Sequence, residues 1–325
     1  MKAAIFESFG QPSEVLTCGE ADKPEPGKGE VRIKTGLASI HNHDLILVEG
    51  NYGYRPELPA IGGSEAMGVV DALGEGVSGF EIGQRIATSF TQGTWAEYFT
   101  VKADYVVPLP DAISDKTAAQ MLSMPLSALF AIDALGAEEG DWILQSAATG
   151  AVAKVVSMVG KARGIGVINL VRRQSAIDEL NELGITNAVS TEKEDWEDRV
   201  HEILDGNRIK GVIDGVGGKL AGQMLHLIDD KGVFLSFGAM SGEPLELSPN
   251  DLILKQSVVK GFWLGKMLET MPPQRLHGFI KELVELLAEG TVTLQTGEIF
   301  SLDEVADAAT AAREKGKAGK ILLKP

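Results

Sequence analysis

The chain has a single cysteine, Cys18, among its 325 residues. One thiol excludes an intramolecular disulfide and any zinc site built from several cysteines. No segment approaches 18 uninterrupted apolar residues, and the first residues lack the apolar stretch of a signal peptide. We therefore expect no membrane span, no secretory leader and a location in the cytoplasm.

Positive charge is also scarce. The chain has 30 Lys and Arg against 46 Asp and Glu, which gives a formal net charge of −16. Such a chain repels nucleic acid unless a local basic stripe interrupts its surface, and we find no such stripe. Its length allows two domains, and its content of 44% hydrophobic and 23% charged residues is typical of globular proteins. The expected partner is a small molecule.

The first third of the sequence predicts short β-strands. Val31–Thr35 alternates apolar and polar residues, as a half-buried strand does. Glycine and proline follow each predicted strand at short intervals, which indicates a compact β-barrel. The other strands are predicted within residues 67–77, 83–88 and 96–101.

From Ser114 onward the pattern changes to helices and strands in alternation. Ser114 is the expected N-cap of a helix that Pro125 kinks or splits. After Asp141 the alternation predicts a parallel, doubly wound sheet. Its later strands are predicted at 167–171, 211–214, 232–238 and 257–264, and its helices at 175–183, 220–228 and 250–256. Beyond Leu264 we predict helices at 274–289 and 302–314 and strands at 298–300 and 320–324, which return the chain to the first domain.

The segment around residues 141–173 has the pattern of a dinucleotide-binding βαβ unit. A predicted strand leads through small residues into a helix, whose free N-terminal amides can bind a pyrophosphate. The candidate ligands are Thr149, Gly150, Ala151 and Val152. Alanines stand here where such loops usually have glycines that allow close approach of the backbone to the phosphates.

The second strand of this unit ends at Arg172 and Arg173. An acidic residue at this point would accept a hydrogen bond from a free ribose 2′-hydroxyl, whereas arginine accommodates a 2′-phosphate. The sequence therefore predicts NADPH as cofactor. The alternative is a solvated pair at a helix start, although cations there oppose the helix dipole.

Four segments in register carry a family resemblance. They are Gly50–Tyr54 with Pro56–Glu65, Asp214–Gly218, Phe237–Met240 and Gly261–Leu264. Their order and spacing resemble the zinc-independent medium-chain dehydrogenase/reductase superfamily, most closely its trans-2-enoyl-thioester reductases and next its quinone oxidoreductases. The resemblance implies an α/β chain with a GroES-like β-barrel catalytic domain from residues 1–117 and 265–325. It also implies a Rossmann domain with a doubly wound parallel sheet from residues 118–264, and a homodimer that pairs through the strand 257–264.

The positions that hold catalytic zinc in related alcohol dehydrogenases correspond here to His41, Ser64 and approximately Ser123. Only His41 could ligate zinc, and a catalytic site normally needs three protein ligands. We therefore expect no metal.

The resemblance also assigns candidate site residues. Tyr52 is the expected proton donor, because the enoyl reductases use a tyrosine in this context and a phenol can act as general acid. Tyr54 is a weaker alternative, and Asn42 and Asn51 could orient the substrate or form turns. Further candidate cofactor contacts are Gly238, Ala239, Met240, Phe262, Trp263, Leu264 and Lys320.

Alternatives remain open at this point. Tyr52 could simply line the pocket, and Phe262 and Trp263 could be core residues. The expected function is NADPH-dependent reduction of an activated C=C bond, in a 2-enoyl thioester or an enone. The alternatives are an NADPH:quinone oxidoreductase and a non-catalytic NADPH-binding protein.

Overall fold

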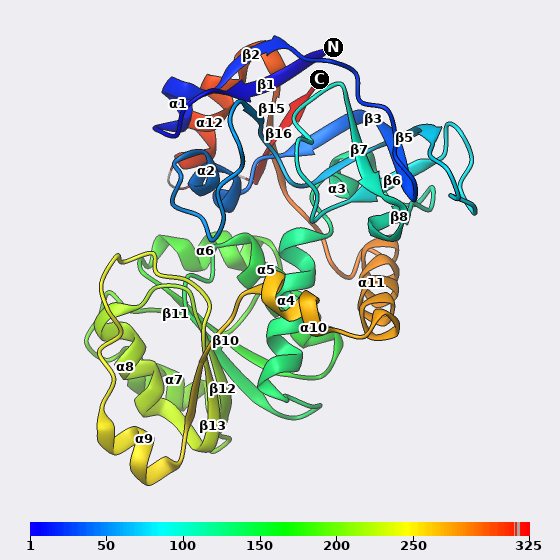
Figure 1. Ribbon diagram of the computed structural model, residues 1–325. Helices are drawn as coiled ribbons and strands as arrows, with labels where there is room; N and C mark the ends of the chain where they lie inside the picture. The colour runs from blue at the N-terminus through cyan, green and yellow to red at the C-terminus, as the bar shows by residue number, and fades with distance from the viewer. Residues whose placement is uncertain (315, 317–318) are drawn as a thin grey trace. The chain divides into compact units, whose positions relative to one another are not determined.

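The computed structural model describes residues 1–314, 316 and 319–325 (Figure 1). The chain divides into two compact units: unit 1 is Met1–Ser123 with Thr293–Pro325, and unit 2 is Met124–Val292. The predicted return at residue 265 therefore differs from the observed one at residue 293. The reason is that α11 (Pro273–Ala288) packs within unit 2, where Phe279 lies 4.5 Å from Phe130 between ring centroids and Glu282 accepts two hydrogen bonds from Arg163.

Unit 1 is built from two β-sheets. A three-stranded sheet has the order β2-β1-β4, and a seven-stranded sheet has the order β15-β16-β3-β5-β6-β8, with β7 also paired to β3. The last strand, β16, pairs antiparallel with β3 and so joins the two ends of the chain in one sheet. The strands are β1 (Lys2–Phe6), β2 (Thr17–Glu20), β3 (Glu30–Ser39), β4 (Ala60–Ile61), β5 (Ala66–Leu73), β6 (Arg85–Thr88), β7 (Tyr98–Lys102), β8 (Val106–Pro108), β15 (Thr296–Ser301) and β16 (Lys320–Lys324).

Short helices complete unit 1. The helices α1, α2 and α12 lie together beside the first strands (Figure 1). Ser114 caps α3 as predicted, since its side chain accepts a hydrogen bond from the backbone N–H of Thr117. The helices are α1 (Pro12–Val15), α2 (Asn42–Val48), η1 (Ala103–Tyr105), α3 (Asp115–Ala118), η2 (Leu302–Glu304) and α12 (Val305–Arg313).

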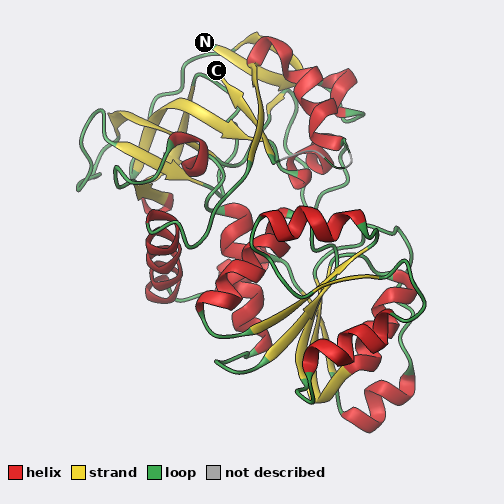
Figure 2. Cartoon of the chain, turned by 180° about the vertical axis from the view of Figure 1, so that it is seen from behind, coloured by secondary structure: helices red, strands yellow, loops and turns green. Residues whose placement is uncertain are grey.

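Unit 2 has one six-stranded parallel sheet with the order β11-β10-β9-β12-β13-β14. Helices cover both of its faces, as Figure 2 shows. The strands are β9 (Trp142–Gln145), β10 (Gly166–Val171), β11 (Ala188–Ser190), β12 (Ile209–Asp214), β13 (Ile228–Ser236) and β14 (Val258–Gly261). The remaining helices are α4 (Ser123–Leu135), α5 (Ala151–Ala162), α6 (Ser175–Glu182), α7 (Trp196–Leu204), α8 (Gly218–Leu227), α9 (Pro249–Lys255) and α10 (Leu264–Thr270).

This strand order confirms the predicted Rossmann sheet. Counted from β9, it reads 3-2-1-4-5-6, the order of dinucleotide-binding folds. From β9 the next strands along the chain are added on one side of the sheet, and from β12 onward they are added on the other side. Ligands of such sheets bind at the carboxyl ends of the strands beside that switch point. The fold therefore puts the predicted phosphate loop, which follows β9, at the place where a cofactor is expected.

Most predicted elements appear within a few residues of their predicted bounds. The predicted split near Pro125 is present: α3 ends at Ala118, and Pro125 lies in the first turn of α4, where a missing N–H costs no helical hydrogen bond. The predicted strand 257–264 is shorter, because Leu264 already begins α10. Searched over the described part of the chain, no helix combines the length and the hydropathy that crossing a bilayer requires.

Candidate functional site

The phosphate loop of unit 2 connects β9 to α5. Gly150 is the N-cap residue of α5, and no side chain caps this end of the helix. Thr149, Gly150 and Ala151 are exposed, whereas the Val152 side chain is buried and only its backbone could face a ligand. The uncapped amides and the positive end of the helix dipole suit a pyrophosphate.

A buried polar network underlies this loop. The Gln145 side-chain amide donates to the backbone oxygen of Ala153 at 2.8 Å and to the Asn169 side-chain oxygen at 2.6 Å. Ser157 on α5 donates to the same Asn169 oxygen at 2.7 Å. These bonds fix the start of α5 on β9 and β10, although the loop lacks the usual glycines. This network was not predicted from the sequence, where its signal is limited to amide side chains inside otherwise apolar strands.

The other end of α5 lies very close to the sheet. A Cβ atom on Gly160 would come within 2.5 Å of Val167 on β10, so only glycine allows this approach. The tight helix–strand packing of a dinucleotide fold is therefore present, but it is provided outside the phosphate loop.

Arg172 and Arg173 directly follow β10 and are both exposed. Among the described residues, neither guanidinium group has a hydrogen bond, an ion pair or a ring contact, whereas Lys154 on the neighbouring helix pairs with Glu179 at 2.9 Å. Two uncompensated cations therefore stand at the carboxyl end of the strand next to the phosphate loop. A bound 2′-phosphate would neutralise them.

Asp214, fully buried at the end of β12, shapes the second loop of this edge. Its carboxylate accepts hydrogen bonds from Ser146 at 2.7 Å and from the backbone N–H groups of Val216 and Gly217 at 3.0 and 2.9 Å. Because Ser146 follows β9, this carboxylate joins the two strands of the switch point.

The predicted residues Gly238, Ala239 and Met240 follow β13 and lie against the loop after β12. The Met240 N–H donates to the Gly215 oxygen at 3.1 Å, and a Cβ on Gly238 would meet that oxygen at 3.0 Å. Ala239 and Met240 are exposed, with 79% of Met240 accessible. They are therefore available to a cofactor at the same sheet edge.

The segment after β14 contains both packed and exposed side chains. Phe262 stacks on Phe237, with 5.1 Å between the ring centroids, and Trp263 is 41% exposed. Leu264 is buried at the start of α10. Of these candidates, Trp263 has the exposed ring that a cofactor could contact, whereas Phe262 also braces the adjacent loop.

In unit 1, the candidate tyrosine lies in the loop after α2. Tyr52 is half-buried against the hydrophobic core, and its ring lies 5.8 Å from those of His43 and Tyr54 between centroids. The pKa of Tyr54 is raised, first by burial and then by Asp44 and Tyr52. Its phenol therefore stays protonated at neutral pH.

The two asparagines are exposed on either side of this loop. Asn42 opens α2 and is not in a turn, because the Asp44 carboxylate accepts the His41 N–H at 2.9 Å and so caps the helix. Asn51 follows the left-handed Gly50, where a Cβ would come within 2.9 Å of Phe9.

Behind the tyrosines is a fully buried histidine–glutamate pair. His41 Nε2 lies 2.6 Å from Glu65 Oε2 and 2.7 Å from Ser39 Oγ. Glu65 also accepts the backbone N–H groups of Leu122 at 2.6 Å and Ser123 at 3.2 Å. The pairing of His41 with Glu65 was not predicted from the sequence. Among the described residues, no group of three or more His, Cys, Asp or Glu side chains is placed to hold a metal ion.

Burial governs the protonation of this pair. It raises the pKa of Glu65 to about 8, against the opposing effect of the two backbone hydrogen bonds, and lowers the pKa of His41 well below its usual value. Lys320, at the start of β16, also lowers both pKa values. Its side chain thus acts on the buried pair in unit 1, which the prediction of a cofactor contact did not anticipate.

Trp95 explains the Gly-Gly-Ser-Glu segment that leads into β5. A Cβ on Gly62 or Gly63 would lie 2.3 Å from the fully buried indole, so both positions require glycine. The indole N–H donates to the Ser39 oxygen at 3.0 Å. The indole thus fixes the segment that carries Ser64 and Glu65.

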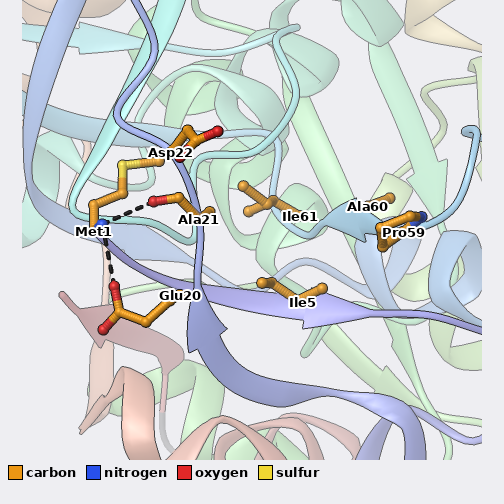
Figure 3. A pocket seen from close by; sticks show the side chains of 8 residues that line it. All are labelled: Met1, Ile5, Glu20, Ala21, Asp22, Pro59, Ala60 and Ile61. Atoms are coloured by element: carbon orange, nitrogen blue, oxygen red, sulfur yellow. Dashed lines mark hydrogen bonds and ion pairs between the residues drawn. The ribbon is translucent and has the colours of Figure 1, made fainter.

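Unit 1 also has a separate hollow of about 560 Å³, shown in Figure 3. None of the predicted site residues lines it. Its lining residues are Met1, Ile5, Glu20, Ala21, Asp22, Pro59, Ala60 and Ile61.

Comparisons with known proteins show which family and fold the chain is similar to. The sequence profile of the alcohol dehydrogenase GroES-like domain matches residues 27–111, and that described as zinc-binding dehydrogenase matches residues 151–285. The mitochondrial enoyl-[acyl-carrier-protein] reductase of Arabidopsis thaliana is 30% identical over 311 residues, which cover 93% of this chain and 82% of the relative.

Two solved structures have the same fold over the whole chain. A putative NADPH:quinone reductase from Bacillus thuringiensis has a TM-score of 0.92 and 27% identity, covering 100% of this chain and 98% of that one. The Escherichia coli quinone oxidoreductase, solved in complex with NADPH, has a TM-score of 0.89 and 25% identity, with both chains covered completely.

The raised pKa of Glu65 predicts a pH-dependent stability. The folded protein keeps a proton that the unfolded chain, with a glutamate pKa of 4.5, releases, so this contribution is lost as the pH rises toward 8. The lowered pKa of His41 makes the stability rise with pH, but only below its usual pKa of 6.5, where the histidine of the unfolded chain is protonated. The change between pH 6.5 and 8 is therefore due to Glu65. We expect the free energy of unfolding in urea to fall by on the order of 1–2 kcal/mol across this window.

The variant Glu65→Gln should remove this decline, because glutamine resembles the protonated acid. Glu57→Gln, at an exposed glutamate, is the matched control and should keep the wild-type slope. Equal slopes for wild type and Glu65→Gln would contradict the assignment.

Proposed function

Because the chain belongs to the medium-chain dehydrogenase/reductase family, we propose that it is an NADPH-dependent reductase of an activated C=C bond, in a 2-enoyl thioester or a related enone. The main support for NADPH as the cofactor is the pair of arginines directly after β10, whose guanidinium groups have no partner among the described residues. The name of the Arabidopsis relative, an enoyl-[acyl-carrier-protein] reductase, supports the substrate class.

Unit 2 supplies the groups that would hold the cofactor. The uncapped start of α5 would bind the pyrophosphate through backbone amides, and Arg172 and Arg173 would bind the 2′-phosphate. Met240 and Trp263 would add apolar contacts. When bound, NADPH supplies a hydride for the β carbon of the substrate.

Unit 1 supplies the proton chemistry. Addition of hydride to the β carbon leaves negative charge on the α carbon and the carbonyl oxygen. The Tyr52 phenol would donate a hydrogen bond to the developing enolate and then its proton to the α carbon. Tyr54, Asn42 and Asn51 would contact the substrate around it.

A second candidate is an NADPH:quinone oxidoreductase. Both solved structures described above are of quinone reductases, and they match the whole chain. In that case Tyr52 would be a wall of the pocket. The cytoplasmic location stays a prediction of the sequence.

We also propose a homodimer that pairs through β14. This strand forms one edge of the six-stranded sheet, since within the described part of the chain it pairs only with β13. Exposed apolar side chains lie on and beside it: Ile253 is 63%, Leu254 77% and Val258 50% accessible. An unprotected edge with such side chains favours pairing with another strand.

The arginine pair predicts a cofactor preference. Replacing both Arg172 and Arg173 by alanine should raise the KM for NADPH on the order of 10- to 100-fold, because two charged contacts to a phosphate are lost. The KM for NADH should not change, as measured by steady-state oxidation of each cofactor. The double variant Lys193→Ala, Arg199→Ala removes two other exposed cations of unit 2 and should behave as wild type. Equal losses for NADPH and NADH would refute the assignment.

The substrate assignment predicts a much higher kcat/KM for crotonyl-CoA than for 1,4-naphthoquinone under identical conditions. Tyr52→Phe should lower kcat for crotonyl-CoA on the order of 100-fold or more and leave the KM for NADPH unchanged. Tyr54→Phe, which removes the neighbouring phenol, should retain most activity. Faster turnover of the quinone, with a fully active Tyr52→Phe, would support the second candidate.

The edge strand predicts the oligomeric state. Light scattering after size-exclusion chromatography should give about twice the chain mass of 34.6 kDa for wild type and a single chain mass for Leu254→Lys, Val258→Lys. Ile299→Lys, on the exposed edge strand β15 of unit 1, is the control and should leave the dimer intact. A monomeric wild type, or a dimeric double variant, would contradict this interface.

A further inference from the structure

A hydrogen-bonded chain runs from a buried carboxylate to the ring of His43. Ser64 Oγ donates to Asp44 Oδ1 at 2.6 Å and lies 2.9 Å from His43 Nε2. Asp44 is 4% exposed at its side chain, whereas His43 is 24% exposed. This series of hydrogen bonds therefore begins in the interior of unit 1 and ends at a partly accessible imidazole.

This arrangement fixes the tautomer of His43. The single hydroxyl proton of Ser64 is used in the bond to Asp44, so Ser64 Oγ can only accept from His43. The proton of the neutral ring is therefore on Nε2, and Nδ1 carries a lone pair that can take up a second proton. A carboxylate, a hydroxyl and an imidazole in this order hold a histidine ready for proton transfer at its other nitrogen.

The His43 ring lies beside the proposed proton donor. It stacks on His41, with 5.0 Å between centroids and 10° between the planes, and lies 5.8 Å from the Tyr52 ring at 31°. Stacking on a buried ring and bonding to Ser64 restrict the imidazole to one orientation. The imidazole and the phenol ring are therefore near neighbours in unit 1.

From this geometry we propose that His43 is the positioning residue that returns a proton to Tyr52 after each turnover. The inference rests on the proposed function, in which Tyr52 is the proton donor. Asp44 and Ser64 act through His43 by holding its tautomer.

The bound NADPH would supply the hydride for the new C–H bond at the β carbon and would itself be oxidised to NADP⁺. The O–H bond of Tyr52 then breaks, and its proton takes the enolate electron pair to form the C–H bond at the α carbon, leaving a phenolate. The Nδ1–H bond of the His43 imidazolium breaks as its proton passes to the phenolate, directly or through one water. Neutral His43 finally takes a proton from solvent.

The imidazolium also stabilises the phenolate by its charge until that transfer. The charged and titratable groups around His43 come from several elements of unit 1. They are Asp44 on the same helix, the stacked His41, Tyr52 and Tyr54 on the following loop, Glu65 before β5 and Lys320 on β16.

The kinetic test uses His43→Gln, whose amide can still donate to Ser64 but cannot carry a second proton. We expect kcat for crotonyl-CoA at pH 7 to fall on the order of tenfold, with the KM for NADPH unchanged. The wild-type kcat should decline with rising pH, whereas the kcat of the variant should be flat over the same range. The solvent deuterium isotope effect on kcat should increase in the variant, because return of the proton then limits turnover.

Ser64→Ala is the second variant, since it removes only the group that sets the tautomer. It should lower kcat less than His43→Gln, and the double variant should lose no more than His43→Gln alone. An unchanged pH profile and isotope effect in His43→Gln, with Tyr52→Phe inactive, would overturn the relay and leave the proposed function intact. A fully active Tyr52→Phe would instead overturn the proposed proton donor.

A measurement without substrate tests the tautomer directly. The chain has five histidines, so ¹⁵N-histidine labelling gives a simple spectrum in which His43→Gln assigns the ring. At high pH we expect the His43 signals of a neutral ring protonated at Nε2, and a loss of this preference in Ser64→Ala. A ring protonated at Nδ1 in the wild type would refute the arrangement whatever the substrate proves to be.

Discussion

The buried carboxyl group of Glu65 is the constraint on which unit 1 depends. It joins the end of β3, through His41, to the start of β5 and to the backbone of Leu122 and Ser123. A buried polar group without partners is strongly destabilising, so these segments must remain together in the folded state. Trp95 adds a steric constraint, because its indole lies directly on the glycines before Ser64. The positions of Ser64, His43 and Tyr52 follow from these two restraints.

Unit 2 uses the same physical device at its sheet edge. Asp214 ties the loop after β12 to the loop after β9, and Gln145 with Asn169 anchors the start of α5. These side chains are buried and hydrogen-bonded, and the loops that they hold are exposed. A parallel sheet exposes the carboxyl ends of its strands at one edge, so the rigid part of the fold presents its loops where a cofactor is needed. The network under α5 offsets the absence of glycines in the phosphate loop.

The two units contribute different chemistry. Unit 2 presents exposed cations and an uncapped helix start, which suit a phosphate-rich cofactor in a chain whose net charge is −16. Unit 1 presents phenols and an imidazole backed by hydrogen-bonded acids, which suit the movement of a proton. In the proposed function, hydride and proton transfer thus depend on separate parts of the chain, each with its own buried support.

The sequence by itself determined the parallel sheet, the barrel-type strands and the position of the arginine pair, because periodicity, small residues and strand ends are local signals. It also indicated Tyr52 through a motif. It did not reveal α2, whose start depends on a cap by Asp44, or the packing of α11 on unit 2, which depends on Phe130. Only the tertiary structure joined Glu65 to His41 and to Leu122, 57 residues away, and placed His43 beside Tyr52. Such contacts are decided by the packing of distant segments, and no local pattern of residues encodes that packing.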